Sequence, residues 1–152
     1  MLLKPQSPWK LSELINNSSS PIPDEKGTYL VAIPKEIYNI KRHGPSQFIC
    51  IGGTDFSLSF RVGLFITAIF GFKTPHSEGN RFFDERGVHK INPWDLIFWW
   101  YPCNDSKCCE VRLFEEFVCD FNNRKPLLNK IKKNTGCGRE VHRIEIEVPW
   151  RK

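Results

Sequence analysis

Hydrophobic residues gather in two short runs in the first third of the chain, at 28–33 and 47–51. Both runs are rich in β-branched and aromatic residues, and proline or glycine bounds them, which is typical of β-strands. The intervening segment, 34–46, contains two prolines and a glycine, so the pattern predicts an extended hairpin. A third run, 95–101, reads Asp-Leu-Ile-Phe-Trp-Trp-Tyr and predicts another, largely buried strand.

Two other stretches have helical patterns. A serine at position 57 or 59 is placed to cap a helix that runs to about Phe70. Between 110 and 121 the apolar residues stand at positions 114, 117, 118 and 121, which is the spacing of an amphipathic helix. Residues 73–93 contain two prolines and two glycines and are expected to be rich in loops.

These elements divide the chain into three parts. Residues 1–26, with four prolines and a serine tract, predict an arm that lies on the domain or projects from it. Residues 27–130 form the domain, and 131–152 a basic extension in which 141–148 alternates like an edge strand. The prediction is a mixed α/β domain with a small three-stranded, mainly antiparallel sheet flanked by helices.

Positive charge is concentrated near the C-terminus. The formal net charge is +5, and residues 124–152 hold nine lysines and arginines against three glutamates. Phosphates attract such residues without sequence preference, so this stretch is a candidate nucleic-acid contact. The candidate contacts are Lys130, Lys132, Lys133, Arg139 and Arg143. A solvated surface strand explains the same charges without a ligand, and this alternative stays open.

The chain does not have the pattern of a membrane or secreted protein. Its longest uncharged apolar run, 62–72, has eleven residues, whereas a membrane span needs about 20. The N-terminus lacks the basic and apolar block of a secretory signal, so we expect a cytoplasmic protein whose six cysteines are mainly free thiols. A zinc site is disfavoured because no C-x2-C pair occurs among its candidate ligands, which are Cys103, Cys108, Cys109, Cys137 and His142.

Several residues that carry little information alone follow a characteristic order. Gly27-Thr28-Tyr29 opens the first predicted strand, and Cys50-Ile51-Gly52 ends the second. Arg61 lies in the next helix, Glu115 in the later helix, and Pro126-Leu-Leu-Asn129 follows. This order, over about 27–129, resembles the GIY-YIG nuclease superfamily.

The segment His76-Ser-Glu-Gly79 is similar to a histidine-containing loop of restriction-type members of that superfamily. The resemblance implies a metal-dependent DNA endonuclease of restriction type that hydrolyses phosphodiester bonds without a small-molecule cofactor. Cleavage of both strands by such an enzyme would suggest a homodimer, because a single active site cuts one strand.

The resemblance also implies a role for each matching residue. Tyr29 would accept a proton or orient the attacking water, and Arg61 would clamp a phosphate oxygen. Glu115 would hold a single Mg²⁺ or Mn²⁺ ion, since hard cations prefer carboxylates. His76 would contact phosphate or carry a proton. Asn129 would orient the glutamate end of the site or touch phosphate.

Helix geometry favours Glu115 over Glu116 as the metal ligand. If positions 114, 117, 118 and 121 form the buried stripe, a step of about 100° per residue places Glu116 nearly opposite that stripe. Glu115 then lies at the edge of the stripe, where its carboxylate reaches a cleft beside the sheet.

The chain departs from the family pattern at two positions. Cys50 stands where a tyrosine is usual, and Gly53 stands where many members have a basic residue. A thiol does not reproduce the hydrogen bond of a phenol at the same reach. These departures motivate an alternative hypothesis, a catalytically inactive nucleic-acid-binding module on the same scaffold.

Overall fold

The computed structural model describes residues 2–6, 8–38, 45–121, 125–129 and 144–151. Its strands are β1 (Leu2–Leu3), β2 (Trp9–Lys10), β3 (Gly27–Tyr38), β4 (Pro45–Thr54), β5 (Ile97–Pro102) and β6 (Glu145–Ile146). Its helices are α1 (Leu11–Asn16), α2 (Leu58–Ile69), α3 (Ser77–Asp84), α4 (Arg86–His89) and α5 (Ser106–Asp120), with a 3-10 turn at Pro93–Asp95.

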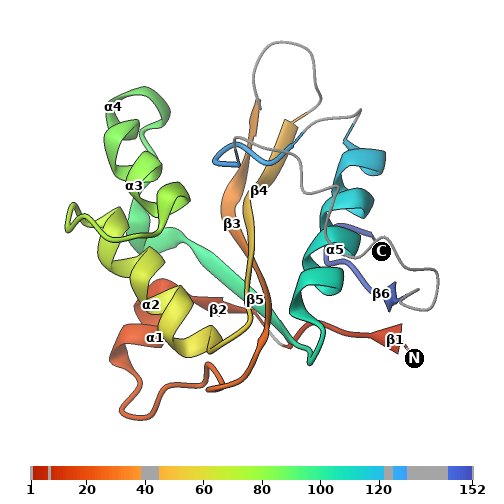
Figure 1. Cartoon of the computed structure of the whole chain (residues 1–152). Helices are drawn as coiled ribbons and strands as arrows, with labels where there is room; N and C mark the ends of the chain where they lie inside the picture. Colours follow the sequence, from red (N-terminus) through yellow and green to blue (C-terminus); the bar gives the residue numbers. More distant parts are fainter. Residues whose placement is uncertain (1, 7, 39–44, 122–124, 130–143, 152) are drawn as a thin grey trace.

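A four-stranded antiparallel sheet forms the centre of the molecule (Figure 1), and its strand order is β2-β5-β3-β4. The predicted α/β class and the three predicted strands are confirmed, since β3, β4 and β5 are the long strands. The fourth strand, β2, is a two-residue contribution from the N-terminal arm. Strand β3 lies between β4 and β5, so Tyr29 is paired with Gly52 on one side and with Trp100 on the other.

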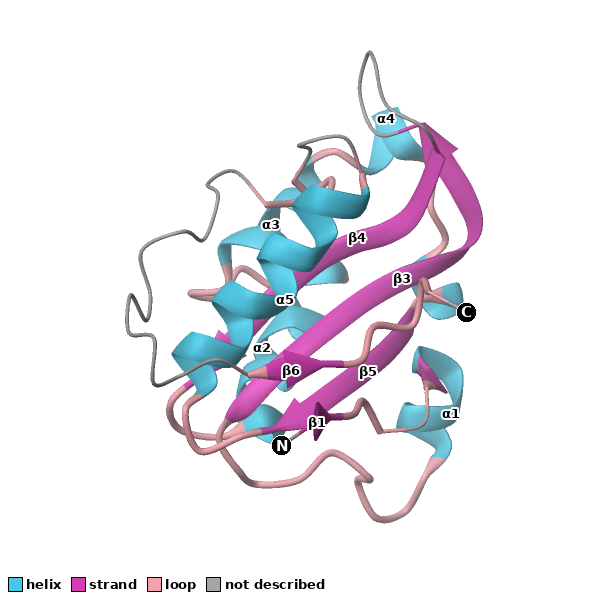
Figure 2. Ribbon diagram, turned by 90° about the vertical axis from the view of Figure 1, so that its right-hand side faces the viewer, coloured by secondary structure: helices cyan, strands magenta, loops and turns pink. Residues whose placement is uncertain are grey.

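Helices cover both faces of this sheet. Helices α1, α2 and α3 lie on one face, where Val62 and Phe65 of α2 pack with Phe98 of β5. Helix α5 runs across the other face (Figure 2), where its Phe114 and Phe117 pack against residues of β3 and β4. Alternate residues of β3 therefore enter two different cores, and Tyr29 belongs to the one beneath α2.

Strands from near the two ends of the chain lie side by side next to α5. Strand β1 pairs with β6 in parallel, which makes a second sheet of two strands (Figure 2). Of the predicted edge strand 141–148, residues 141–143 lie outside the described part, and β6 covers two of the others. After β6, the Trp150 ring packs edge-on against Phe48 and Phe117, so the C-terminus helps to close the core beneath α5.

The two predicted helices are present, but one starts earlier than expected. The Ser57 side chain accepts a hydrogen bond from Phe60 N at 3.1 Å, which caps α2 as predicted. Helix α5 begins at Ser106, four residues before the predicted start, and Asp105 caps it. The Cys-rich first turn has no strong apolar period of its own, so the pattern did not reveal it.

The prediction of loops over 73–93 is wrong. This segment forms α3, α4 and the 3-10 turn, and His76 caps α3. Gly79, which suggested a loop, allows α3 to pack closely on α2. A Cβ at this position would lie 2.8 Å from the Ala68 Cβ and 3.0 Å from the Phe65 carbonyl oxygen.

The expectation that the cysteines are free thiols is wrong for at least three of them. Cys103 and Cys109 form a disulfide that ties the end of β5 to the first turns of α5. Cys108 is also disulfide-bonded, whereas Cys50 and Cys119 are thiols. None of the described helices is long and apolar enough to cross a membrane.

Candidate functional site

Tyr29 is fully buried and crosses from its own strand onto β4. A Cβ at the paired residue, Gly52, would lie only 2.2 Å from Tyr29 Oη. Any side chain at position 52 would therefore displace the ring. The two triplets of the motif thus have a direct physical relation, because the glycine of the second makes room for the tyrosine of the first.

The Tyr29 hydroxyl contacts His76, which lies 47 residues further along the chain. Tyr29 Oη and His76 Nε2 form a short hydrogen bond, and both residues have no exposed surface. The other ring nitrogen, Nδ1, accepts the backbone N–H of Gly79 at 3.3 Å and so caps α3. The ring of Phe65 packs edge-on against the imidazole, with centroids 5.1 Å apart. The structure thus brings Tyr29 and His76 together.

Burial keeps both groups neutral at pH 7. It raises the pKa of Tyr29 well above its usual value, with a further contribution from Cys50, while Arg61 acts in the opposite direction. Burial, assisted by Arg61, lowers the pKa of His76 to about 4. A neutral imidazole whose Nδ1 accepts a hydrogen bond carries its proton on Nε2. His76 therefore donates to Tyr29 Oη, and the hydroxyl proton of Tyr29 is available for another acceptor.

Arg61 supplies positive charge next to this pair. It lies in the first turns of α2, where its backbone N–H donates to the Ser57 carbonyl at 2.9 Å. The side chain is partly buried and interacts electrostatically with both Tyr29 and His76. Glu78 of α3 also acts on both groups and raises the pKa of each. The predicted arginine is therefore at the site.

Glu115 does not join this group. Its side chain is 55% exposed and lies 3.6 Å from Arg112 on the outer face of α5. Glu110 is the α5 carboxylate whose charge raises the pKa of Tyr29. A Cβ at Gly53 would lie 2.5 Å from Glu110 Oε2, so this glycine makes room for the carboxylate at the end of β4.

The sequence contained a signal for Glu110. Glu110 precedes Leu113, Phe114 and Phe117 by three, four and seven residues, so it lies on the face of the helix that these residues bury. Our prediction centred the stripe on 114, 117, 118 and 121 and omitted Leu113. The expectation that Glu116 lies opposite the stripe is also wrong, because its side chain is only 13% exposed.

Asn129 is buried and lies beside the same strand end. Its side chain accepts the Ile51 N–H at 3.0 Å and donates to the Ile51 carbonyl at 2.9 Å. The adjacent Leu128 N–H donates to the Ile49 carbonyl at 2.8 Å. The segment 126–129 is thus a turn that is held against the outer edge of β4. Asn129 fixes the backbone one residue before Gly52, so the described contacts give it a positioning role.

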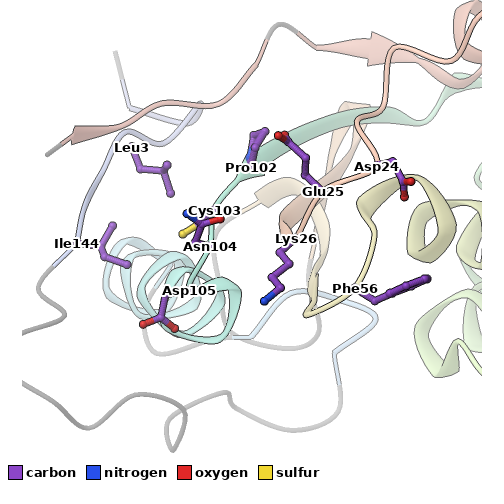
Figure 3. A pocket seen from close by; sticks show the side chains of 10 residues that line it. All are labelled: Leu3, Asp24, Glu25, Lys26, Phe56, Pro102, Cys103, Asn104, Asp105 and Ile144. Carbon is purple, nitrogen blue, oxygen red and sulfur yellow. The ribbon is translucent and has the colours of Figure 1, made fainter.

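The five predicted phosphate contacts, Lys130, Lys132, Lys133, Arg139 and Arg143, lie outside the described residues. The structure does describe a cavity of about 720 Å³ at the end of the sheet where β3 begins (Figure 3). Lys26 and three carboxylates line it, those of Asp24, Glu25 and Asp105. None of the predicted catalytic residues lines this cavity, whose charge is unfavourable for phosphate.

Comparisons with protein-family models, with curated proteins and with solved structures found no match to this chain. The site is therefore interpreted from its own geometry and from the order of its residues.

Proposed function

We propose that this chain is a metal-dependent DNA endonuclease that hydrolyses phosphodiester bonds and is similar to GIY-YIG nucleases. The hydrogen bond between Tyr29 and His76 is the observation that carries this proposal. It joins two buried polar residues 47 positions apart, beside a cationic and an anionic side chain. Titratable groups buried beside charged side chains are common at functional sites, which supports the proposal.

In this proposal Arg61, His76 and Tyr29 have separate roles in phosphodiester hydrolysis. Arg61 binds a non-bridging phosphate oxygen and stabilises the negative charge that develops in the transition state. His76 Nε2–H fixes the Tyr29 oxygen, so that the hydroxyl proton would be directed to a phosphate oxygen or to the attacking water once the site, which is closed in this structure, opens to substrate. Because its pKa is raised, Tyr29 acts as an orienting hydroxyl and not as a resting phenolate.

The donor set fits a loosely held Mg²⁺ or Mn²⁺ and not a closed metal site. Among the described residues, no three His, Cys, Asp or Glu side chains form a group that could hold a metal ion. Magnesium is commonly held by one or two carboxylates together with water and substrate phosphate. Glu110 is the carboxylate that would hold it, and the bound ion would polarise the phosphate.

A second function, that of a catalytically inactive nucleic-acid-binding module, is favoured by a different observation. Tyr29 and His76 have no exposed surface, and Cys50 stands in the place of the second tyrosine. This alternative predicts salt-sensitive DNA binding that persists without metal and without Glu110, and no cleavage.

Cleavage of supercoiled plasmid distinguishes the two functions. With Mg²⁺ or Mn²⁺ the wild-type protein should nick or linearise the plasmid, and EDTA should stop the reaction. Arg61→Gln should reduce the rate by about 100-fold or more, because a transition-state contact is lost. The matched control is Arg112→Gln, which changes an arginine on the outer face of α5. DNA binding without cleavage under any metal would refute the enzymatic proposal and support the binding module.

A further inference from the structure

Two phenylalanines are exposed where β4 meets α2. Phe56 is 74% exposed and Phe60 is 59% exposed, and their rings meet edge to face with centroids 6.0 Å apart. Large apolar side chains are usually buried, so an exposed pair that contributes nothing to either core suggests a binding role.

The pair lies next to the proposed catalytic group. Phe60 immediately precedes Arg61 on α2, and their Cα atoms are about 3.8 Å apart. Successive side chains leave a helix about 100° apart, so a phosphate held by Arg61 would lie on the side of α2 next to that of Phe60, with its base on the side of the rings. The first N–H groups of α2 do not compete for that phosphate, since Leu58 N donates to Glu25 O and Ser59 N to Pro23 O.

Charge defines the direction in which a nucleotide would lie. Figure 3 shows Phe56 at the rim of the cavity, where the three carboxylates of Asp24, Glu25 and Asp105 outnumber the one lysine, Lys26. These carboxylates repel phosphate, whereas Arg61 attracts it. A nucleotide would therefore turn its phosphate toward Arg61 and its uncharged base toward Phe56.

The size of the patch favours a base over a protein partner. Two phenylalanine side chains bury at most about 500 Å², whereas a stable protein interface buries about 800 Å² on each partner. One exposed ring is enough to stack a nucleobase. In an edge-to-face pair, one ring keeps a free face for stacking while the other supports its edge.

We infer that Phe56 and Phe60 form a stacking platform for an unpaired base next to the scissile phosphate, so that the substrate is single-stranded DNA or DNA with an extruded base. This inference rests on the proposed function, because Arg61 supplies the phosphate contact. A base inside a regular duplex cannot offer its face to a phenylalanine ring.

Binding measured in EDTA tests the inference without catalysis. The probes are an end-labelled single strand, the same strand in a perfect duplex, and the strand with one 2-aminopurine. The wild-type protein should bind the single strand more tightly than the duplex and quench 2-aminopurine. Phe56→Ala and Phe60→Ala should each weaken single-strand binding by about tenfold. The salt dependence of binding should not change, since no phosphate contact is lost.

Phe72→Ala is the matched control, because Phe72 is 70% exposed but follows the other end of α2. The inference would be overturned if Phe56→Ala and Phe60→Ala bound the single strand as tightly as Phe72→Ala does. The two rings would then be explained by contact with a protein partner. Tighter binding of the duplex, or no binding of either probe, would overturn it as well. If only Phe56→Ala and Phe60→Ala lost single-strand affinity while the wild-type protein did not cleave plasmid, the stacking platform would be supported and the endonuclease proposal refuted.

Discussion

Tyr29 reaches His76 only because residue 52 has no side chain. Tyr29 lies in β3, and His76 is the cap of α3. The Tyr29 ring crosses β4 at Gly52, one residue after Ile51, whose backbone is hydrogen-bonded to Asn129. At the scale of single residues, the candidate site thus depends on a glycine as much as on the polar groups that carry the chemistry.

Gly52→Ala tests this dependence. A Cβ would lie 2.2 Å from Tyr29 Oη, so the ring must move and the hydrogen bond to His76 is lost. We expect the free energy of unfolding in urea to fall by about 1–3 kcal/mol. The control is Gly63→Ala in α2, where a Cβ has no neighbour within 4 Å and should stabilise the helix by up to about 1 kcal/mol. Equal stability of Gly52→Ala and wild type would contradict this description.

His76 should make the stability of the fold depend on pH. Its pKa is lowered to about 4 in the folded state, whereas that of an unfolded chain is near 6.5. The unfolded chain therefore binds more protons between these values, and stability falls as the pH falls through this window. The slope contributed by one such group approaches about 1.4 kcal/mol per pH unit.

Urea unfolding from pH 7 to pH 4 measures this slope. His76→Gln should flatten this slope relative to the wild-type protein measured beside it. Identical slopes for wild type and His76→Gln would show that His76 is not the group responsible.

At the scale of elements, the sequence pattern predicted the strands and the helix cap that depend on neighbouring residues in the chain. The strands β3, β4 and β5 and the cap of α2 follow from short apolar runs, breakers and one serine. Helix α3 was missed because Gly79 is required by packing against α2, a contact that sequence does not display. Glu110 was missed because the first turn of α5 was not recognised, so the buried face of that helix was placed incorrectly.

The segment 126–129 shows the same limit. It forms a turn in which the Asn129 N–H donates to the Pro126 carbonyl at 3.0 Å. The contact of Asn129 with Ile51 of β4 spans 78 residues and follows only from the folded topology. Asn129→Ala leaves the Ile51 N–H and carbonyl without their partners, so we expect a loss of about 2–3 kcal/mol in the free energy of unfolding. The exposed Asn104→Ala is the control, and urea unfolding is the measurement. A loss below 0.5 kcal/mol, on the order expected for surface changes, would contradict the role of Asn129 in holding β4.

At the scale of the whole molecule, the sheet has a core on each face, and the candidate site collects residues from both sides. His76 and Arg61 come from the α2 and α3 side, whereas Glu110 comes from α5 on the other (Figure 1). Each of them acts on Tyr29, His76 through its hydrogen bond and Arg61 and Glu110 through their charge. Gly52 makes room for the Tyr29 ring and Gly53 for the Glu110 carboxylate at the end of β4. The same end of the molecule carries the exposed Phe56 and Phe60, which gives the proposed substrate a path to Arg61.

The most direct test of this account is the initial rate of metal-dependent plasmid cleavage by Glu110→Gln and Glu115→Gln, measured side by side. Both changes remove one carboxylate from α5, but only Glu110 lies next to Gly53 and acts on Tyr29. We predict that Glu110→Gln loses at least about 100-fold in rate, while Glu115→Gln stays within about twofold of wild type. Loss of cleavage in Glu115→Gln with normal cleavage in Glu110→Gln would contradict the site described by the structure.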